Sequence, residues 1–274
     1  MSGILYLVGT PIGNLGDFSP RAVQTLESVD FIAAEDTRVT LKLLNHFGIK
    51  KPLICYFEHN RAEMGEKLLS RLLRGESCAL VSDAGMPAIS DPGEDIVRRC
   101  AEVGVTVCCI PGPSAVVTAL AMSGLPTQRF TFEGFLAVSG KSRREHLESL
   151  RGEKRTMVLY EAPHKLLKTL CDLLDVLGDR DVALCRELTK LHEEVIRTTL
   201  SAVVKRFGQD APRGEFVIVL RGAEEKCETA APEQALELVA RYRAEGKSLK
   251  EAARLASADT GIAKNVLYSM AIDK

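Results

Sequence analysis

The chain has 274 residues, of which 46% are hydrophobic and 27% are charged, and its formal net charge is -1. This composition is typical of a globular protein, and the length favours more than one hydrophobic core. Because the net charge is close to zero, it excludes nucleic-acid binding through overall charge, so such binding would require a local basic patch.

Short apolar runs alternate with amphipathic segments in the first third of the chain. This alternation favours an α/β domain with a mostly parallel sheet, in which a ligand lies beyond the carboxyl ends of the strands. We predict strands at residues 4–8, 31–34, 78–81 and 106–110, and helices at residues 20–29, 61–74, 96–103 and 115–122, with another that ends at residue 47.

The pattern changes around residues 123–126, where we place a domain boundary. A second α/β domain follows, with a five-stranded sheet for which a mixed arrangement stays open, then a polar linker at residues 224–232 and an all-helical tail. In the second domain we predict strands at residues 130–132, 156–160, 181–185, 195–200 and 215–220, and helices at residues 143–150, 164–177 and 201–207. In the tail we predict helices at residues 232–245, 248–258 and 262–270, a capping box at Ser248 and Glu251, and a tight turn at residues 259–261. The predicted domains are residues 1–122, 123–223 and 232–274.

Cysteine usage and the first residues of the chain indicate a cytoplasmic protein. Residues 4–8 form an apolar run without a basic lead, and no apolar run approaches the length of a membrane span. We therefore expect no signal peptide and no membrane partner. The cysteines lack CxxC spacing, so we interpret them as free thiols that act as small core residues, and we expect no metal. They are Cys55, Cys78, Cys100, Cys108, Cys109, Cys171, Cys185 and Cys227.

Two loops rich in glycine and proline are the clearest functional signal. Residues 82–93 follow one predicted strand, and residues 111–115 follow another. Glycine and alanine leave room for a ligand to approach the backbone, and proline stiffens the path of the chain. The two loops together predict a small-molecule pocket at the strand ends.

Two familiar phosphate-binding patterns fail on spacing. Residues 9–13 do not match G-x-G-x-x-G, because the glycines are four apart and a proline occupies the turn. Residues 134–142 nearly form a P-loop, but the spacing is one residue too long, so a flexible basic loop is the favoured interpretation.

The basic residues suggest where RNA would be held. Residues 137–155 carry an excess of positive charge that suits RNA phosphates, although a solvated helix surface explains the charge equally well. The tail has nearly balanced charge, so we expect no DNA binding there; a docking role and an RNA-contacting role both remain open.

Polar residues follow several of the other predicted strands. They occur at residues 35–38, 58–60, 160–164 and 186–190. Four such clusters at one predicted edge suit a cleft between the domains, with carboxylates, a histidine and a lysine as candidates for acid–base catalysis. The sequence contains no Ser-His-Asp elbow or metal cluster, so hydrolysis by either route is not indicated.

Several ordered motifs resemble those of the tetrapyrrole-methylase family. They span the chain as far as residue 222, and the helical tail also fits. The resemblance is greatest to the branch of the family that methylates bacterial small-subunit rRNA. The motifs lie at residues 5–15, 34–38, 82–93, 110–115, 160–164, 186–190 and 214–215.

This resemblance implies a class III methyltransferase fold, with S-adenosylmethionine (SAM) bound between two α/β domains of a homodimer. Three positions depart from the family pattern, since Met86 stands where threonine is usual, Phe57 where histidine is common and Ala137 where proline is frequent. We expect activity to be retained, because the neighbouring motif residues are intact. The implied cofactor contacts are Val8, Asp83, Gly85, Met86, Ile89, Ser114, Ala115, Tyr160 and Leu188.

The implied reaction is methylation of a cytidine ribose 2′-hydroxyl in bacterial 16S rRNA. The implied substrate and partner is this rRNA within the assembled small ribosomal subunit. The alternatives are methylation of a tetrapyrrole carbon and a nucleotide-binding RNA-assembly factor that uses the loop at Lys141. The candidates for proton removal or orientation are Lys190, His59 and Asp36, and those for substrate contact are Asn14, Arg38 and Arg186.

Overall fold

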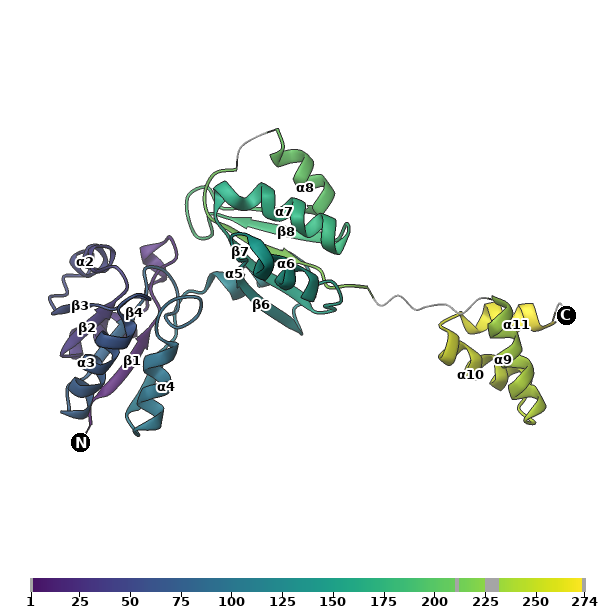
Figure 1. Ribbon diagram of the computed structural model, residues 1–274, viewed down its shortest axis with the longest axis horizontal. Helices are drawn as coiled ribbons and strands as arrows, with labels where there is room; N and C mark the ends of the chain where they lie inside the picture. The colour runs from purple at the N-terminus through teal and green to yellow at the C-terminus, as the bar shows by residue number, and fades with distance from the viewer. Residues whose placement is uncertain (1, 210–211, 225–231, 273–274) are drawn as a thin grey trace. The chain divides into compact units, whose positions relative to one another are not determined.

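The computed structural model describes residues 2–209, 212–224 and 232–272. The chain divides into two compact units, Met1–Ala223 and Glu224–Lys274 (Figure 1). The first unit contains two separate sheets. The division of residues 1–223 into two domains at residue 122 stays a prediction.

The first sheet is entirely parallel, as the alternation of strands and helices predicts. Its strand order is β3-β2-β4-β1-β5. The short β3 was not predicted, because its three residues show no alternation long enough to detect. The strands are β1 (Ile4–Val8), β2 (Phe31–Ala34), β3 (Leu53–Cys55), β4 (Cys78–Val81) and β5 (Thr106–Ile110).

Helices cover both faces of the first sheet. In β4, Ala79 and Val81 join one core and Leu80 joins the other, because successive side chains of a strand point to opposite faces. This explains why the strand is a continuous apolar run. Leu26 of α1 (Pro20–Ser28) and Leu44 of α2 (Thr37–His46) join the first core. The other core receives side chains from α3 (Arg61–Leu73) and α4 (Glu94–Glu102).

The second sheet is mixed, with the order β6-β7-β10-β8-β9. Only β6 and β7 pair in parallel, and the other neighbours are antiparallel. The five predicted strands are confirmed, with β6 three residues longer than expected. They are β6 (Phe130–Phe135), β7 (Thr156–Glu161), β8 (Asp181–Arg186), β9 (Glu194–Thr199) and β10 (Phe216–Leu220).

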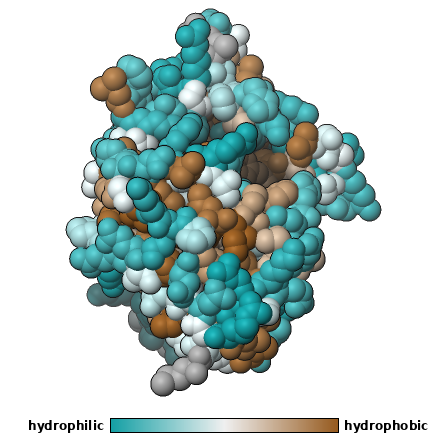
Figure 2. Space-filling view, turned by 90° about the vertical axis from the view of Figure 1, so that its left-hand side faces the viewer, coloured by the Kyte–Doolittle hydropathy of each residue, from teal (hydrophilic) through white to brown (hydrophobic). Residues whose placement is uncertain are grey.

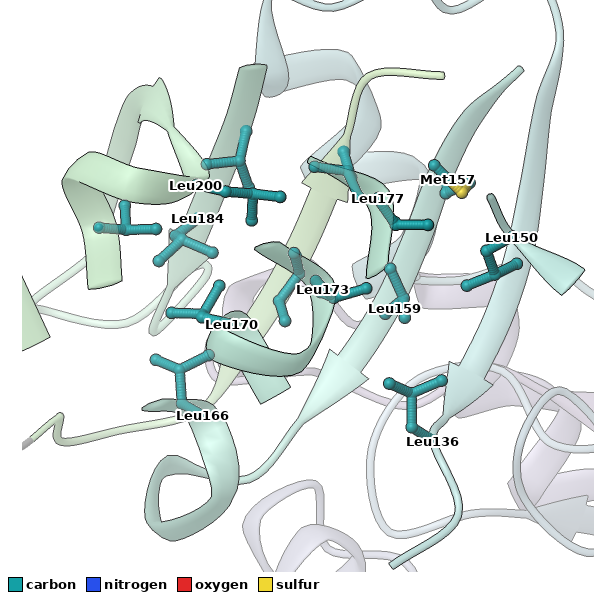
Figure 3. Close-up of a cluster of buried hydrophobic side chains, with 14 of the residues drawn as sticks. Leu136, Leu150, Met157, Leu159, Leu166, Leu170, Leu173, Leu177, Leu184 and Leu200 are labelled. Atoms are coloured by element: carbon teal, nitrogen blue, oxygen red, sulfur yellow. The ribbon is translucent and has the colours of Figure 1, made fainter. Parts of the chain in front are cut away.

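Leucines fill the main core of this second sheet (Figure 3). They come from the strands and from α6 (Gly140–Ser149), α7 (Pro163–Leu177) and α8 (Leu200–Phe207). The opposite face is covered by α5 (Ala115–Ser123), whose apolar side chains pack on β7, β8 and β10. Helix α5 therefore begins at a loop of the first sheet and packs on the second.

Two loop interpretations are wrong. Residues 134–142 are not a flexible loop, because Gly134 and Phe135 end β6 and α6 begins at Gly140. Lys141 thus lies in the first turn of a helix, where it pairs with Glu145 at 3.6 Å. In the tail, Asp259 and Thr260 are helical rather than part of a turn.

The second unit consists of α9 (Pro232–Ala244), α10 (Leu249–Thr260) and α11 (Lys264–Ile272) around a small core of its own. The hydroxyl of Ser248 accepts a hydrogen bond from the Glu251 N–H, which confirms that half of the predicted capping box. Most of the predicted linker, residues 225–231, lies outside the described residues.

All seven cysteines within the described ranges are free, as predicted, but not all lie in the core. Cys55, Cys109 and Cys171 are exposed, so the core interpretation is wrong for these three. Burial raises the pKa of Cys78 to about 12. Cys227 lies outside the described residues. No described helix is both long enough and apolar enough to cross a membrane.

Candidate functional site

The loops after β1, β4 and β5 meet at one edge of the first sheet. The Thr10 N–H donates to the Gly85 carbonyl at 2.8 Å, and the Gly85 N–H donates back to Thr10 at 3.1 Å. The Gly9 N–H donates to the carbonyl of Ile110, the last residue of β5, at 3.1 Å. Backbone hydrogen bonds therefore join the two glycine- and proline-rich loops through the loop that follows β1.

Glycine is required in these loops by close packing and by backbone geometry. A Cβ on Gly9 would lie 2.6 Å from the Met86 sulfur and 2.8 Å from the Cα of Gly112. Gly85 has a φ of +89°, which L-residues rarely adopt. The close backbone approach expected from the sequence is therefore present.

From the second sheet, the loop after β8 is fixed by the side chain of Glu187. One Glu187 oxygen accepts the Glu215 N–H at 2.9 Å and the Lys190 ammonium at 3.1 Å. Lys190 also donates to Glu215 at 2.9 Å. Between these anchored residues, Leu188 is buried against α5 and its neighbours.

A cavity of about 530 Å³ lies between these loops, and residues of both sheets line it. This volume is within the usual range for small-molecule sites. Figure 2 shows hydrophobic side chains gathered around a hollow on one face of the molecule, with hydrophilic side chains over most of the rest. Seven of the nine predicted cofactor residues line the cavity: Gly85, Met86, Ile89, Ser114, Ala115, Tyr160 and Leu188.

The other two predicted cofactor residues lie elsewhere. Val8 is completely buried in the core of the first sheet. Asp83 lines a separate cavity of about 290 Å³, together with Asn14, one of the predicted substrate residues. The Asn14 side chain accepts the Gly16 N–H at 2.9 Å and so caps a short 3₁₀ helix, η1 (Leu15–Asp17).

Backbone strain is concentrated beside the main cavity. Among the described residues other than glycine, four have a positive φ: Ala88, Ser90, Glu187 and Thr189. Ser90 lines the cavity, and the last two flank Leu188. Such conformations cost free energy and persist where the surrounding structure enforces them, which is common at ligand sites.

The predicted catalytic residues are not brought together. Asp36 pairs with Arg38 at 2.6 Å, and the hydrogen bonds from Arg38 hold the pKa of Asp36 down at about 2. His59 is exposed, with its ring 6.1 Å from that of Phe57. In the described structure, no hydrogen bond or ion pair joins any two of Lys190, His59 and Asp36, and none of the three lines the main cavity.

The surroundings of Lys190 favour its charged form. Burial alone lowers the pKa of Lys190, but hydrogen bonds to Glu215 and Glu187 outweigh this effect and leave the pKa above its ordinary value. A lysine that is protonated at neutral pH donates hydrogen bonds and does not accept a proton. Its arrangement therefore favours orientation over proton removal.

A buried polar network behind the cavity was missed by the sequence reasoning. The Thr169 hydroxyl donates to Glu161 at 2.6 Å and accepts from Arg143 at 2.9 Å. Arg143 also pairs with Asp172 at 2.7 Å and is only 7% exposed. Glu161 lines the cavity and belongs to the polar cluster at residues 160–164, whereas Arg143 belongs to the basic segment at residues 137–155, and no sequence pattern links the two.

Carboxylates lie close together at the strand ends of the first sheet, and one of them, Asp91, lines the main cavity. Burial, and then repulsion from Asp83, raise the pKa of Asp91. Burial likewise raises the pKa of Glu35, followed by repulsion from Asp91 and Asp83. Within residues 2–209, 212–224 and 232–272, no group of His, Cys, Asp and Glu side chains is arranged to hold a metal ion.

Comparison with known proteins gives matches along the whole chain. Residues 4–204 match the family model described as Tetrapyrrole (Corrin/Porphyrin) Methylases. A protein from Synechocystis sp. named Ribosomal RNA small subunit methyltransferase I is 48% identical over 273 residues, which cover 99% of this chain and 98% of that protein. A protein of the same name from Halalkalibacterium halodurans is 47% identical, with 98% of this chain and 94% of that protein covered.

A solved structure also resembles this fold. It is a uroporphyrin-III C-methyltransferase from Thermus thermophilus complexed with S-adenosyl homocysteine, with a TM-score of 0.55 at 20% identity, and the match covers 80% of this chain and 97% of that one. At this identity the likeness concerns the fold alone. From the family model and the two sequence relatives, we conclude that the chain belongs to the tetrapyrrole methylase family, whose members have the class III SAM-dependent methyltransferase fold.

Proposed function

We propose that this protein transfers a methyl group from SAM to the 2′-hydroxyl of a cytidine ribose in the 16S rRNA of the bacterial small ribosomal subunit. The single observation that carries the proposal is the cavity lined by both sheets, which contains seven residues expected to contact the cofactor. The name shared by the two sequence relatives supports small-subunit rRNA as the substrate. The choice of ribose and of cytidine rests on the family resemblance.

The residues around the cavity fit SAM. The backbone of Gly85 can approach a ligand closely, and Ser114 begins the turn into α5. Tyr160 packs edge-on against Phe135 at 5.5 Å and forms an aromatic wall suited to adenine. When bound, SAM would supply an electrophilic methyl group, and its transfer to the ribose oxygen would release S-adenosyl homocysteine and pass the hydroxyl proton to solvent water.

The contribution that we propose for the protein is mainly alignment. Aligning two reactants removes much of an activation barrier, and this requires a rigid site. The paired loops of the first sheet and the Glu187–Lys190 loop of the second supply rigid elements from two sides. We therefore assign Lys190 an orienting role and Asp36 an ion-pairing role, and neither acts as a strong base.

The test is methyl transfer with labelled SAM to three separate acceptors. They are small ribosomal subunits from cells that lack this protein, free 16S rRNA and a precorrin-type tetrapyrrole. We expect label in rRNA, in a nucleotide that resists alkaline cleavage because its 2′-oxygen is blocked. Label only in the tetrapyrrole would contradict the proposal.

Two substitutions on α5 provide a matched comparison. Ala115 lines the cavity, so Ala115→Phe places a ring in the volume assigned to the cofactor. Ala121 is exposed on the same helix and lies outside the cavity lining. We expect Ala115→Phe to abolish SAM binding in a calorimetric titration and Ala121→Phe to leave it unchanged.

We further propose that the protein is a homodimer and acts in the cytoplasm, where it meets the ribosomal subunits. Leu191 is 92% exposed and Val138 is 64% exposed, which is unusual for large apolar side chains and suits contact with another surface. Sedimentation analysis tests this, since a dimer has twice the mass of the 29.9 kDa chain.

A further inference from the structure

A second, smaller cavity lies at the same edge of the second sheet as the main cavity. Its volume is about 190 Å³, and Phe216 lines both cavities. Phe216 pairs with Glu161 on one side and with Arg186 on the other, so the ends of β7 and β8 meet the start of β10 here. The lining residues are Arg186, Glu194, Arg206, Phe207, Pro212, Arg213 and Phe216.

The small cavity has a clear excess of positive charge. Among the described residues that line it, the one carboxylate is that of Glu194, which pairs with Arg206 at 3.1 Å and, through its other oxygen, with Arg186 at 3.5 Å. Arg213 has no ion pair with a described residue, and its carbonyl accepts a hydrogen bond from Arg186 at 2.6 Å. Three arginines and one glutamate therefore line this cavity, and two of the arginines share the glutamate.

The side chains of the small cavity suit a phosphate. A guanidinium group presents a planar fork of donors that matches phosphate oxygens, and it stays charged at any physiological pH. Phe207 and Phe216 provide an apolar wall, with their rings 5.9 Å apart, and a charge beside such a wall acts more strongly than one in open water.

The other basic segment of the protein is a poorer candidate. In residues 137–155, Arg151 pairs with Glu148 and Arg155 pairs with Glu153, while Arg143 is buried. Ion pairs with carboxylates of the same segment thus engage three of its six basic residues, and a buried ion pair with Asp172 engages Arg143. The excess at the small cavity depends on the fold, because its arginines come from β8, α8 and the segment before β10.

We propose that Arg186, Arg206 and Arg213 bind a backbone phosphate of the RNA substrate next to the nucleotide being methylated. The inference rests on the proposed function for the identity of the substrate. Phe216 lines both this cavity and the main cavity, so the two lie at neighbouring positions of one sheet edge, where a single RNA strand can reach both. A local phosphate site also explains how a chain with a net charge of -1 holds RNA.

The test uses Arg206→Ala, Arg213→Ala and the double variant of the full-length protein. Neither arginine lines the main cavity. Lys205 is the matched control, because it is exposed on the same helix as Arg206 and does not line the small cavity. Arg206→Lys keeps the charge but loses the planar fork, so we expect a partial defect.

We expect each alanine variant to raise KM for small ribosomal subunits about tenfold, with kcat and SAM affinity unchanged. Affinity for 16S rRNA should fall in parallel, and the slope of log affinity against log salt should decrease by about one for each arginine. Lys205→Ala should stay within about twofold of the wild type, as expected for a solvated charge.

The two proposals can fail separately. If the double variant matches Lys205→Ala in RNA affinity and in salt slope, the phosphate site is wrong, whether or not methyl transfer occurs. If RNA binding depends on the arginines but the wild-type protein methylates no rRNA, the phosphate site stands and the proposed function is wrong.

Discussion

Gly9 and Gly112 approach so closely that neither can carry a side chain in the present backbone. A Cβ on Gly112 would lie 2.8 Å from the Gly9 carbonyl oxygen, and a Cβ on Gly9 would lie 2.8 Å from the Gly112 nitrogen. This contact joins the loops after β1 and β5, and the Gly85 loop of β4 bonds to Thr10 beside it. The loops that form the wall of the main cavity can therefore pack in this way only because residues 9 and 112 are both glycine.

The first prediction is that Gly112→Ala separates these loops. The obstructing atoms belong to the backbone and not to a flexible side chain, so we expect a loss of about 1–3 kcal/mol in the free energy of unfolding. SAM affinity should fall as well, because Ser114 and Ala115 follow directly. Denaturant unfolding and calorimetry measure the two effects.

Gly152→Ala is the control for this prediction. Gly152 has no positive φ, and nothing lies within 4 Å of a Cβ placed there, so the substitution should change neither stability nor SAM binding. Equal effects of the two substitutions would show that close packing at Gly112 is not the cause.

The second prediction concerns Lys190. Because hydrogen bonds to Glu215 and Glu187 outweigh burial and raise the pKa of Lys190, its ammonium group stays charged at neutral pH. Lys190→Arg keeps the positive charge, so it should retain at least about a tenth of kcat. Lys190→Met leaves two carboxylates without their partner and should lose more.

The pH dependence of kcat between pH 6 and 10 completes the test of Lys190. For an orienting lysine, the wild type and Lys190→Arg should have profiles of the same shape. A proton-accepting lysine would give a wild-type rate that rises with pH and an inactive Lys190→Arg, since arginine does not lose its proton.

The third prediction concerns Asp91, whose pKa is raised by burial and then by repulsion from Asp83. A raised carboxyl pKa means that the folded state disfavours the ionised carboxylate. The resulting loss of stability is complete above the pKa of the folded state and absent below the pKa of the unfolded state, which is near 3.9. Asp91→Asn should therefore be more stable than the wild type at pH 7, with an advantage that disappears as the pH falls through the folded pKa.

Asp36→Asn should have the opposite effect on stability and should be less stable than the wild type at pH 7. Arg38 holds the pKa of Asp36 at about 2, so this carboxylate stabilises the fold above the unfolded pKa, and the contribution is lost as the pH falls through about 2. Urea unfolding measures the difference, at pH 7 and pH 4 for Asp91→Asn and at pH 7 and pH 2 for Asp36→Asn. If Asp91→Asn were less stable than the wild type at pH 7, the folded state could not disfavour the ionised Asp91 carboxylate.

The fourth prediction is that Thr169→Val lowers both stability and SAM affinity, although Thr169 does not line the main cavity. The substitution keeps the shape of the side chain but removes a hydroxyl that bonds both Glu161 and Arg143. Leaving buried charged partners short of a hydrogen bond should cost about 1–3 kcal/mol in the free energy of unfolding and should lower SAM affinity.

Thr25→Val is the matched control for Thr169→Val. Thr25 is also buried, but its hydroxyl bonds a carbonyl of its own helix at 2.8 Å and lies in the core of the first sheet. We expect the control to leave SAM affinity unchanged. Unchanged SAM affinity in Thr169→Val would mean that the network supports the fold and not the cavity.

Local sequence features predicted much of the fold and most of the cavity lining. The loops at residues 82–93 and 111–115 carry their signal in adjacent residues, and each follows a strand whose apolar run is continuous. Both properties are local, so they can be seen without knowledge of strand order. The three-residue β3 gave no such signal.

Features that depend on partners far along the chain were not predicted. Arg143 contacts Thr169 and Asp172 because α6 packs beside α7, and the sequence reveals neither the packing nor the pairing. Arg186 and Arg206 meet at Glu194 only once β8, β9 and α8 are assembled. Charge counted along a segment therefore cannot reveal arginines that are brought together from separate elements.

The central claim is tested most directly by a map of ribose methylation in small-subunit rRNA from cells with and without this protein. We predict that one 2′-O-methylcytidine in 16S rRNA is lost without the protein and restored by the wild type but not by Ala115→Phe. An identical methylation pattern in both cell types would contradict the proposed function.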